Sequence, residues 1–425
     1  MKENLILQTL RIRPFLFLIL SEFFSQFAMN LFNFALLIVV FSLARSNSAV
    51  SGVVIAFTLP SIIFGILAGV LVDRWNKKNV LFTTNIIRAL MVFPLVFLNE
   101  NLFLIYFITF GVSLVTQFFI PAETPIIPIL VNKKLLLSAN ALFGMAMYSS
   151  IFFAYALSGP LLFLFGKNNI FTFLAATFLI AAFFAWIVKI KNARNFVSEK
   201  EETAKLGFSY EIKTILTLVS KTKNLYNALF SLTLAQILIY VLAVIGPGYA
   251  QTVLNIKVEN FPILFITPAI LGMALGAIII GSFLHKKSKP LLTKFGLLLL
   301  GLSILLLPYG ARFESREIVQ FINFYLPHIL KVNVIHIMTF LAFIMGIATA
   351  FVFVPANTIL QEETSDESRG KIYGILNSLI GILSFAPVIL VGSLADILGV
   401  KVVITGIGLT VLIIAFVRMF ITDKH

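Results

Sequence analysis

The chain has 425 residues, of which 60% are hydrophobic and 12% are charged, with a net charge of +14 and a mean hydropathy of +1.03. This composition excludes an ordinary water-soluble domain, in which about a quarter of the residues are charged. Cysteine is absent, which excludes disulfide bonds, thiolate catalysis and cysteine metal sites. We therefore expect a membrane protein.

Apolar runs long enough to cross a bilayer follow one another along the chain. A helical span needs about 20 mostly apolar residues, whereas a membrane β-barrel needs alternating segments of about ten, so these continuous runs predict helices. The first run is too long for a cleavable signal peptide, and we expect it to remain as a span. The twelve predicted spans are 15–43, 49–72, 79–98, 102–130, 138–165, 169–190, 225–250, 260–284, 291–309, 333–360, 371–394 and 399–420.

A long polar stretch separates the sixth and seventh runs. It predicts a cytoplasmic linker at 191–224 between an amino-terminal domain, 1–190, and a carboxy-terminal domain, 225–425. Residues 210–219 have apolar side chains at helical spacing, so the linker either lies partly on the membrane surface or is a solvated connector. A second polar insert, 310–331, is predicted to be an outer loop with a short helix.

The Lys and Arg residues are distributed unevenly between the two sides of the predicted membrane. If the amino terminus is inside, 24 of them lie in inner loops and ends and 7 lie outside, while Arg88 lies within a span. This positive-inside bias predicts a multi-pass protein of the plasma (inner) membrane with both termini cytoplasmic. The positive charge then reflects insertion and contact with anionic lipid at the inner face, not binding of nucleic acid.

Two sequence repeats indicate that the chain consists of two similar halves. Phe119–Thr124 in the fourth span recurs as Phe353–Thr358 in the tenth, 234 residues later. Gly159-Pro160 in the fifth span matches Ala386-Pro387 in the eleventh, 227 residues later. Equivalent helices in two six-helix bundles explain both offsets. Two such bundles, related by an axis along the membrane normal and separated by a central cleft, are typical of a large class of transporters.

The charged turn between the second and third spans carries a family resemblance. Gly69, Leu71, Asp73, Arg74, Lys77 and Lys78 in this turn fit the signature Gly-x-Leu-x-Asp-Arg-x-Gly-Arg-Lys, and through it the chain resembles the major facilitator superfamily over essentially its whole length. Asn76 stands where glycine is usual, and asparagine tolerates a left-handed turn. The equivalent turn after the eighth span has His285 in place of the acid. The resemblance implies an all-α membrane protein with twelve transmembrane helices in two pseudo-symmetric six-helix bundles, and a cytoplasmic gate motif formed by Gly69, Asp73, Arg74, Lys77 and Lys78.

Further segments resemble one branch of this superfamily, which contains macrolide exporters and siderophore exporters of the enterobactin type. They are Pro121–Val131, Ala139–Leu142, Gln361-Glu362 and Arg369–Lys371. The resemblance implies a secondary active, proton-coupled exporter of an amphipathic small molecule; an importer or a lysophospholipid flippase of the same fold stays open. Uncharged polar residues in spans that line or border the cleft in this family either contact substrate or pack helices, and these are Gln117, Asn140, Gln236, Tyr240, Asn357 and Asn377.

A polar stripe runs along the first span. Glu22, Gln26, Asn30 and Asn33 are spaced by four, four and three residues and therefore share one helical face. Because polar groups in hydrocarbon are costly, this face is predicted to lie toward the central cleft or another helix. Glu22 lies roughly 13 Å from Arg13 along the helix. It either exchanges a proton in each transport cycle or makes a structural hydrogen bond.

Two further charged residues lie well inside predicted spans, away from the span ends. Arg88 in the third span could pair with Glu22, extend to the inner surface, or hold the amino-terminal half together, and we favour the structural role. Glu123 in the fourth span is a second candidate for proton coupling, and Asn357 occupies the matching position in the tenth span.

Proline and glycine in the fifth and eleventh spans predict helix bends at Gly159, Pro160 and Pro387. Gly159-Pro160 resembles the fifth-helix motif of antiporters in the superfamily, although its further glycines are absent. Antiport and plain helix packing both explain it. A phosphate-binding loop and a clustered set of histidines are absent from the sequence, so we expect no cofactor and no metal site. Neither an enzyme nor a receptor is indicated, and we expect a monomer.

Asp73 is predicted to act as a latch. In a major facilitator fold the inner ends of the second and eleventh helices meet when the cytoplasmic side is shut. Asp73 would then face the start of the eleventh helix near Gly370 and Lys371, where the helix dipole is positive, and stabilise this state by about 0.3 to 1 kcal/mol. The alternative is that the turn only follows the positive-inside rule. This rule explains Lys77 and Lys78 well but explains the acidic Asp73 poorly.

The latch predicts that Asp73→Asn inserts normally into the membrane but transports poorly, because the neutral amide loses its attraction to the helix dipole. Membrane abundance by immunoblotting and transport in the same cells measure the two effects. Full transport by this variant would contradict the latch.

Overall fold

The computed structural model describes residues 5–73, 75–98, 100–189, 222–284, 286–309, 333–364 and 366–421. All regular structure in these residues is helical, and eleven of the helical segments are long and apolar enough to cross a membrane. The all-helical prediction is therefore confirmed. A continuous helix is what such runs must form, because it pairs its own backbone groups where no water is available.

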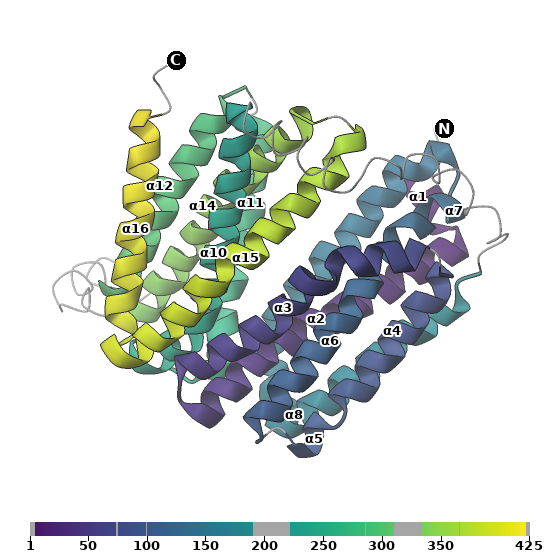
Figure 1. Ribbon diagram of the computed structural model, residues 1–425, viewed down its shortest axis with the longest axis horizontal. Helices are drawn as coiled ribbons and strands as arrows, with labels where there is room; N and C mark the ends of the chain where they lie inside the picture. The colour runs from purple at the N-terminus through teal and green to yellow at the C-terminus, as the bar shows by residue number, and fades with distance from the viewer. Residues whose placement is uncertain are drawn as a thin grey trace, which may run out of the picture. The chain divides into compact units, whose positions relative to one another are not determined.

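The chain divides into two compact units (Figure 1). The first holds the described residues before Ala44 and from Gly52 to Lys189, and the second holds Ala44–Ser51 and the described residues from Thr222 onward. The helices that lie mainly in the first unit are α1 (Leu5–Leu10), α2 (Arg13–Ala44), α3 (Asn47–Asp73), α4 (Lys77–Val92), α5 (Leu95–Leu98), α6 (Leu102–Glu123), α7 (Ile127–Leu130) and α8 (Leu136–Ile187). Those of the second are α10 (Lys223–Thr252), α11 (Thr267–Phe283), α12 (Lys289–Leu306), α14 (Val334–Glu362), α15 (Asp366–Leu398) and α16 (Val400–Ile421).

Single glycines separate the last two spans of each half. The fifth and sixth predicted spans both lie in α8. Within α8, Gly166 alone has backbone dihedral angles outside the helical region, with φ 70° and ψ 175°. Gly399, with φ 86°, separates α15 from α16. Side chains other than glycine rarely adopt such positive φ angles. Two glycines therefore turn the chain at equivalent places in the two repeats.

The fourth predicted span, 102–130, is not one continuous helix. α6 ends at Glu123, a 3₁₀ turn follows at Thr124–Ile126, and α7 is a single helical turn. Pro125 explains the end of α6, because proline disfavours the helical conformation in the residue before it. Glu123 therefore lies at the carboxyl end of its helix.

Asn76 takes a different role from the left-handed turn that its position in the signature suggested. Its φ of −69° and ψ of 108° are those of an extended residue, and its side-chain oxygen accepts a hydrogen bond of 3.3 Å from the backbone N–H of Asn79. The left-handed explanation is wrong. Asparagine suits this position because it caps the first turn of α4.

Ser46 and the first residues of α3 pack within the second unit, on the carboxylate of Asp396 in α15. This carboxylate accepts hydrogen bonds from the side chains of Ser46 (2.6 Å), Asn47 (2.9 Å) and Ser48 (2.7 Å), and from the backbone N–H groups of Asn47 (2.7 Å) and Ser48 (3.0 Å). A carboxylate at a helix amino terminus satisfies N–H groups that have no partner within the helix. These bonds explain why Ala44–Ser51 belongs to the second unit.

Several predicted segments fall outside the described residues. They include the linker up to residue 221, the insert 310–331 and His285. α10 begins at Lys223, two residues before the predicted seventh span, and α15 begins at Asp366, five residues before the predicted eleventh.

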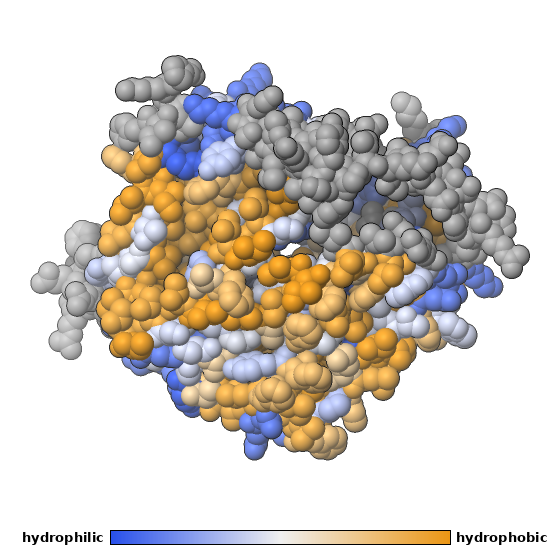
Figure 2. All heavy atoms as spheres, viewed as in Figure 1, coloured by the Kyte–Doolittle hydropathy of each residue, from blue (hydrophilic) through white to orange (hydrophobic). Residues whose placement is uncertain are grey.

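The surface of the described helices is rich in large apolar side chains, and the face shown in Figure 2 is predominantly hydrophobic. Phe163 is 84% exposed, and Phe283 and Ile397 are each 77% exposed. In water, apolar surface on this scale would be costly, whereas in a bilayer it faces lipid tails.

Small residues let α11 and α14 approach closely in the second unit. A Cβ atom at Gly346 would overlap the backbone carbonyl of Ala269, and one at Gly272 would overlap that of Phe343. Backbone atoms cannot move aside as a side chain can. Helices in membranes commonly pack through small residues in this way.

We expect Gly346→Ala to destabilise the protein by about 1 to 3 kcal/mol, the cost typical of an overpacked interior. Gly406→Ala in α16 is the matched control, because a Cβ there meets no atom within 4 Å. Thermal unfolding of both purified variants in detergent measures the difference, and equal melting temperatures would refute the account of this contact.

Candidate coupling site

Three ionisable residues from three helices meet inside the first unit. Glu22 of α2 and Arg88 of α4 are each 1% exposed, and Glu123 at the end of α6 is 6% exposed. The carboxyl groups of Glu22 and Glu123 lie beside each other, and both lie within Coulombic range of Arg88. The structure thus brings together the two candidates for proton coupling and the one charged residue predicted to lie within the third span.

Arg88 is enclosed by protein and does not extend to the surface. Its Nη1 atom donates hydrogen bonds to Ser25 Oγ (2.9 Å) and Asn85 Oδ1 (3.4 Å), and its guanidinium lies 4.5 Å from the ring centre of Phe119 and 5.8 Å from that of Phe178. The Ser25 hydroxyl in turn donates to Asn85 Oδ1 over 2.9 Å. An arginine above aromatic rings gains a cation–π attraction that grows when water is excluded.

The sequence analysis did not single out Ser25 or Asn85, and it named Phe119 only as the first residue of a repeat, although a signal was available for Ser25 and Asn85. Ser25 follows Glu22 by three residues and Asn85 precedes Arg88 by three, so each lies on the same helical face as its charged neighbour. These side chains hold the guanidinium in a fixed orientation beside the two carboxyl groups.

Several buried polar atoms of this cluster have no hydrogen bond of standard geometry among the described residues. They are both carboxyl oxygens of Glu22, Glu123 Oε2, and Arg88 Nε and Nη2. Buried polar groups without partners cost free energy, so such a cluster is held at the expense of stability. The arrangement has the donors and acceptors to exchange one ion pair for another, or to take up a proton.

The rest of the predicted stripe on α2 is partly buried. Asn30 Nδ2 donates to the backbone oxygen of Gln26 over 2.8 Å, and Asn33 Oδ1 has no hydrogen-bond partner among the described residues. Gln26, Asn30 and Asn33 lie within about 80° of Glu22 around the helix. The predicted common face is therefore a property of the helix, while its role in binding substrate stays a prediction.

The other predicted cavity residues make separate local contacts. Gln117 donates to the backbone oxygen of Ser113 (3.2 Å). Asn357 donates to that of Phe353 (2.9 Å) and accepts a bond from Tyr373 (3.1 Å). Tyr240 lies beside Gln236 on α10, while Asn140 and Asn377 are exposed.

Within the gate motif, Gly69 lies on α3, and Lys77 and Lys78 open α4. α3 ends at Asp73, but the Asp73 side chain, Arg74 and the Lys371 side chain lie outside what the structure describes. The latch stays a prediction.

The prolines of the predicted helix bends lie inside helices, Pro160 in α8 and Pro387 in α15. In α8 the residue with non-helical dihedral angles is Gly166, six residues after Pro160.

We expect Arg88→Gln to destabilise the protein by about 3 to 5 kcal/mol, because it leaves two buried carboxyl groups without their cation. Adding Glu22→Gln is expected to restore part of the loss. Thermal unfolding in detergent measures both, with the exposed Arg45→Gln as the matched control. If Arg88→Gln and Arg45→Gln unfold at the same temperature, Arg88 is not a structural counter-ion.

The described fold matches solved transporter structures. The nucleoside transporter NupG superposes with a TM-score of 0.75 at 14% sequence identity, covering 97% of this chain and 100% of that one. At such low identity the match shows the fold alone.

Curated relatives cover most of the chain. The MFS-type transporter YfiS of Bacillus subtilis (strain 168) is 25% identical over 397 residues, 90% of this chain and 87% of YfiS. BacE of the same strain, a proposed bacilysin exporter, is 26% identical, covering 78% of this chain and 76% of its own. Macrolide efflux protein A of Streptococcus pyogenes is 21% identical, covering 81% and 80%. Relatives named for export agree with the exporter branch that the sequence motifs indicated.

The sequence-family model of the Major Facilitator Superfamily matches residues 18–315. This match covers more than half of the chain and includes the charged turn after the second span. With this match, the helical spans and the shared fold, the chain belongs to the Major Facilitator Superfamily and is a multi-pass membrane transporter.

Proposed function

We propose that this transporter is a proton-coupled exporter of amphipathic small molecules that works by alternating access. The observation that carries the proposal is the buried cluster of two carboxyl groups and one guanidinium at Glu22, Glu123 and Arg88. Ionisable residues inside a membrane are costly, and in transporters they commonly mark a proton or substrate pathway.

The charge balance of the cluster gives it a reason to bind a proton. One guanidinium can compensate one carboxylate, and a second carboxylate beside them would leave a net buried negative charge. A proton on either Glu22 or Glu123 removes that charge. Because the two carboxyl groups lie beside each other, loss of a proton shared between them would favour a different ion pairing with Arg88. A proton that binds one conformation more tightly than another can thus drive a transport cycle.

Export and the class of substrate are supported by the relatives and by composition. One relative is named as a macrolide efflux protein and another as a proposed bacilysin exporter. The chain has 45 Phe residues and few buried charges, which favours an apolar or amphipathic substrate over a sugar or a phosphate. The uneven distribution of Lys and Arg supports cytoplasmic termini, so the Asp73 turn would gate the cytoplasmic side.

Transport into proteoliposomes tests the proposal. We expect a panel of dyes and antibiotics to include compounds that accumulate under an imposed pH gradient and fail to accumulate without one. Glu22→Gln or Glu123→Gln should reduce gradient-driven accumulation to the level of empty liposomes, because an amide cannot exchange the proton. Exchange of substrate across the membrane without a gradient should persist.

Glu100→Gln is the matched control, since it makes the same chemical change at an exposed position outside the cluster. It should transport as the wild type does. Substrate movement that is indifferent both to the gradient and to Glu22→Gln would defeat proton coupling. A gradient dependence lost in one glutamate variant alone would identify the acid that carries the proton.

A further inference from the structure

The turn that carries the gate motif is in contact with the helix that carries Glu123. Trp75 lies in this turn, two residues after Asp73, at a position that the family signature leaves open. Its ring stacks on that of Phe118 in α6, with the ring centres 5.7 Å apart and 13° between the ring planes. The next residue, Phe119, has its ring centre 4.5 Å from the guanidinium of Arg88. Two adjacent residues of α6 therefore contact the turn and the buried arginine.

The geometry of α6 explains both contacts. Phe119 and Glu123 are four residues apart, so they share the face of α6 that meets Arg88 and Glu22. We call the buried group of Glu22, Arg88 and Glu123 the Glu22 cluster. Phe118 is one residue earlier and lies about 100° around the helix, which turns it toward a different neighbour. About one and a half helical turns thus separate the carboxyl group of Glu123 from the ring that holds the gate turn.

The turn is fixed to the helices of the Glu22 cluster by other contacts as well. Val72, at the end of α3, is buried in the same apolar core as Phe119 and Ala122. Asn76 caps α4, the helix that carries Arg88. Closely packed interiors transmit small displacements because they contain little empty space to absorb them. A rearrangement within the Glu22 cluster is therefore in direct packing contact with the turn.

We propose that Phe118 and Phe119 transmit the protonation state of the Glu22 cluster to the turn at Trp75, and so link proton binding to the cytoplasmic gate. The inference rests on the proposed proton coupling and names the route by which that site controls the gate. When loss of a proton changes the ion pairing of Arg88, the guanidinium moves relative to the ring of Phe119, and α6 carries the change to the stacked pair. Because such linkage is reciprocal, the position of the turn also favours one protonation state of the cluster.

Tryptophan fluorescence tests this link, because the chain has only two tryptophans, Trp75 and Trp186. In the purified full chain with Trp186→Phe, in detergent, all tryptophan emission comes from Trp75. This emission differs between an indole that is stacked on another ring and one that is surrounded by water. It is recorded against pH without substrate, so the measurement does not depend on transport.

The titration has to be assigned to the Glu22 cluster and not to other ionisable groups. The charged side chains of the cluster are Glu22 from α2, Arg88 from α4 and Glu123 from α6, and α8 contributes the ring of Phe178. Histidine ordinarily titrates near neutral pH, and the sequence of the first unit contains none. The gate turn has charged residues of its own, which are kept in every variant: Asp73, Arg74, Lys77 and Lys78.

We expect the emission maximum of Trp75 to shift with pH. The shift should be lost in Glu22→Gln/Glu123→Gln, which leaves no carboxyl group to titrate in the cluster. It should also be lost in Phe118→Leu, which removes the stacked ring but keeps both carboxyl groups. Phe118→Tyr preserves a stacking ring and should keep the shift.

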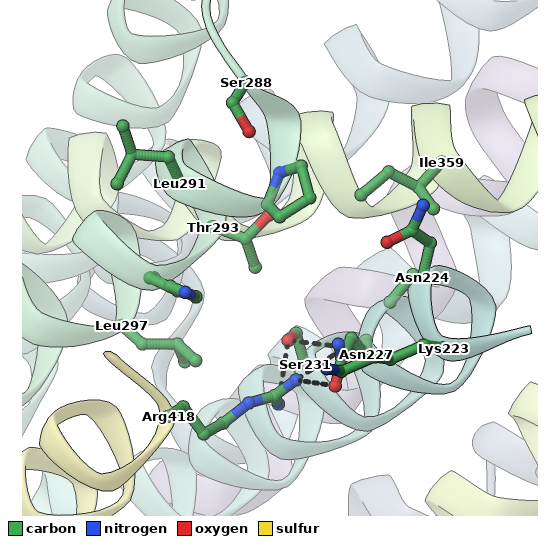
Figure 3. A pocket seen from close by; sticks show the side chains of 13 residues that line it. Lys223, Asn224, Asn227, Ser231, Ser288, Leu291, Thr293, Leu297, Ile359 and Arg418 are labelled. Carbon is green, nitrogen blue, oxygen red and sulfur yellow. Dashed lines mark hydrogen bonds between the residues drawn. The ribbon is translucent and has the colours of Figure 1, made fainter. Parts of the chain in front are cut away.

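The matched control is Phe230→Leu, which makes the same substitution beside an arginine of the second unit. The ring of Phe230 lies 4.5 Å from the guanidinium of Arg418, and Figure 3 shows Arg418 extending from α16 toward Asn227 and Ser231 of α10. This variant should keep the shift of the Trp75 emission.

Emission of Trp75 that does not depend on pH would overturn the link, as would a shift that persists in Phe118→Leu or in Glu22→Gln/Glu123→Gln. An equal loss in Phe118→Leu and Phe230→Leu would overturn it too. Any of these results leaves the proposed function standing if gradient-driven accumulation still requires a glutamate of the cluster. The expected emission changes, combined with transport that is indifferent to the gradient, would support the link and defeat proton coupling.

Discussion

The constraint on which this structure depends is that hydrocarbon offers no partner for a backbone N–H or C=O group. Long uninterrupted helices satisfy this constraint, and at several breaks between them in the described residues a glycine or a proline permits the change of conformation. Gly166 and Gly399 take positive φ angles between consecutive spans, and Pro125 follows the end of α6. The amino-terminal end of α3 is satisfied in another way, by the five hydrogen bonds that Asp396 accepts from Ser46, Asn47 and Ser48.

The same constraint governs side chains, and the two units meet it differently. The first unit concentrates its buried charge in one cluster, where Arg88 is held by Ser25, Asn85 and aromatic rings. At the repeat position of Glu123, the second unit has the neutral Asn357, whose amide is satisfied by Phe353 and Tyr373. The two units are therefore chemically unequal at matching positions of the sequence repeat. The proposed proton chemistry belongs to the first unit.

Buried polar atoms without a hydrogen-bond partner are unusual in stable proteins, and within the described part of the chain the Glu22 cluster contains several. A fully paired cluster would stabilise one conformation, whereas a transporter has to visit at least two. A site whose ion pairs can be exchanged at small cost is compatible with that requirement.

Much of this protein was determined by its sequence alone, because spans of about 20 apolar residues and the turn signature depend on local order. The helical class, the places of the spans and the superfamily follow from these patterns. Two details of the sequence-based prediction were wrong for a related reason. The role of Asn76 as a helix cap and the break after Glu123 depend on backbone angles, which residue type only biases.

Tertiary structure alone decided which polar residues meet. Glu22, Arg88 and Glu123 are 66 and 35 residues apart along the chain, and no periodicity connects them. Asp396 and Ser46, or Arg418 and Asn227, are farther apart still. Contacts of this kind arise when helices pack side by side, since packing brings distant faces together and excludes the water that would otherwise separate their charges.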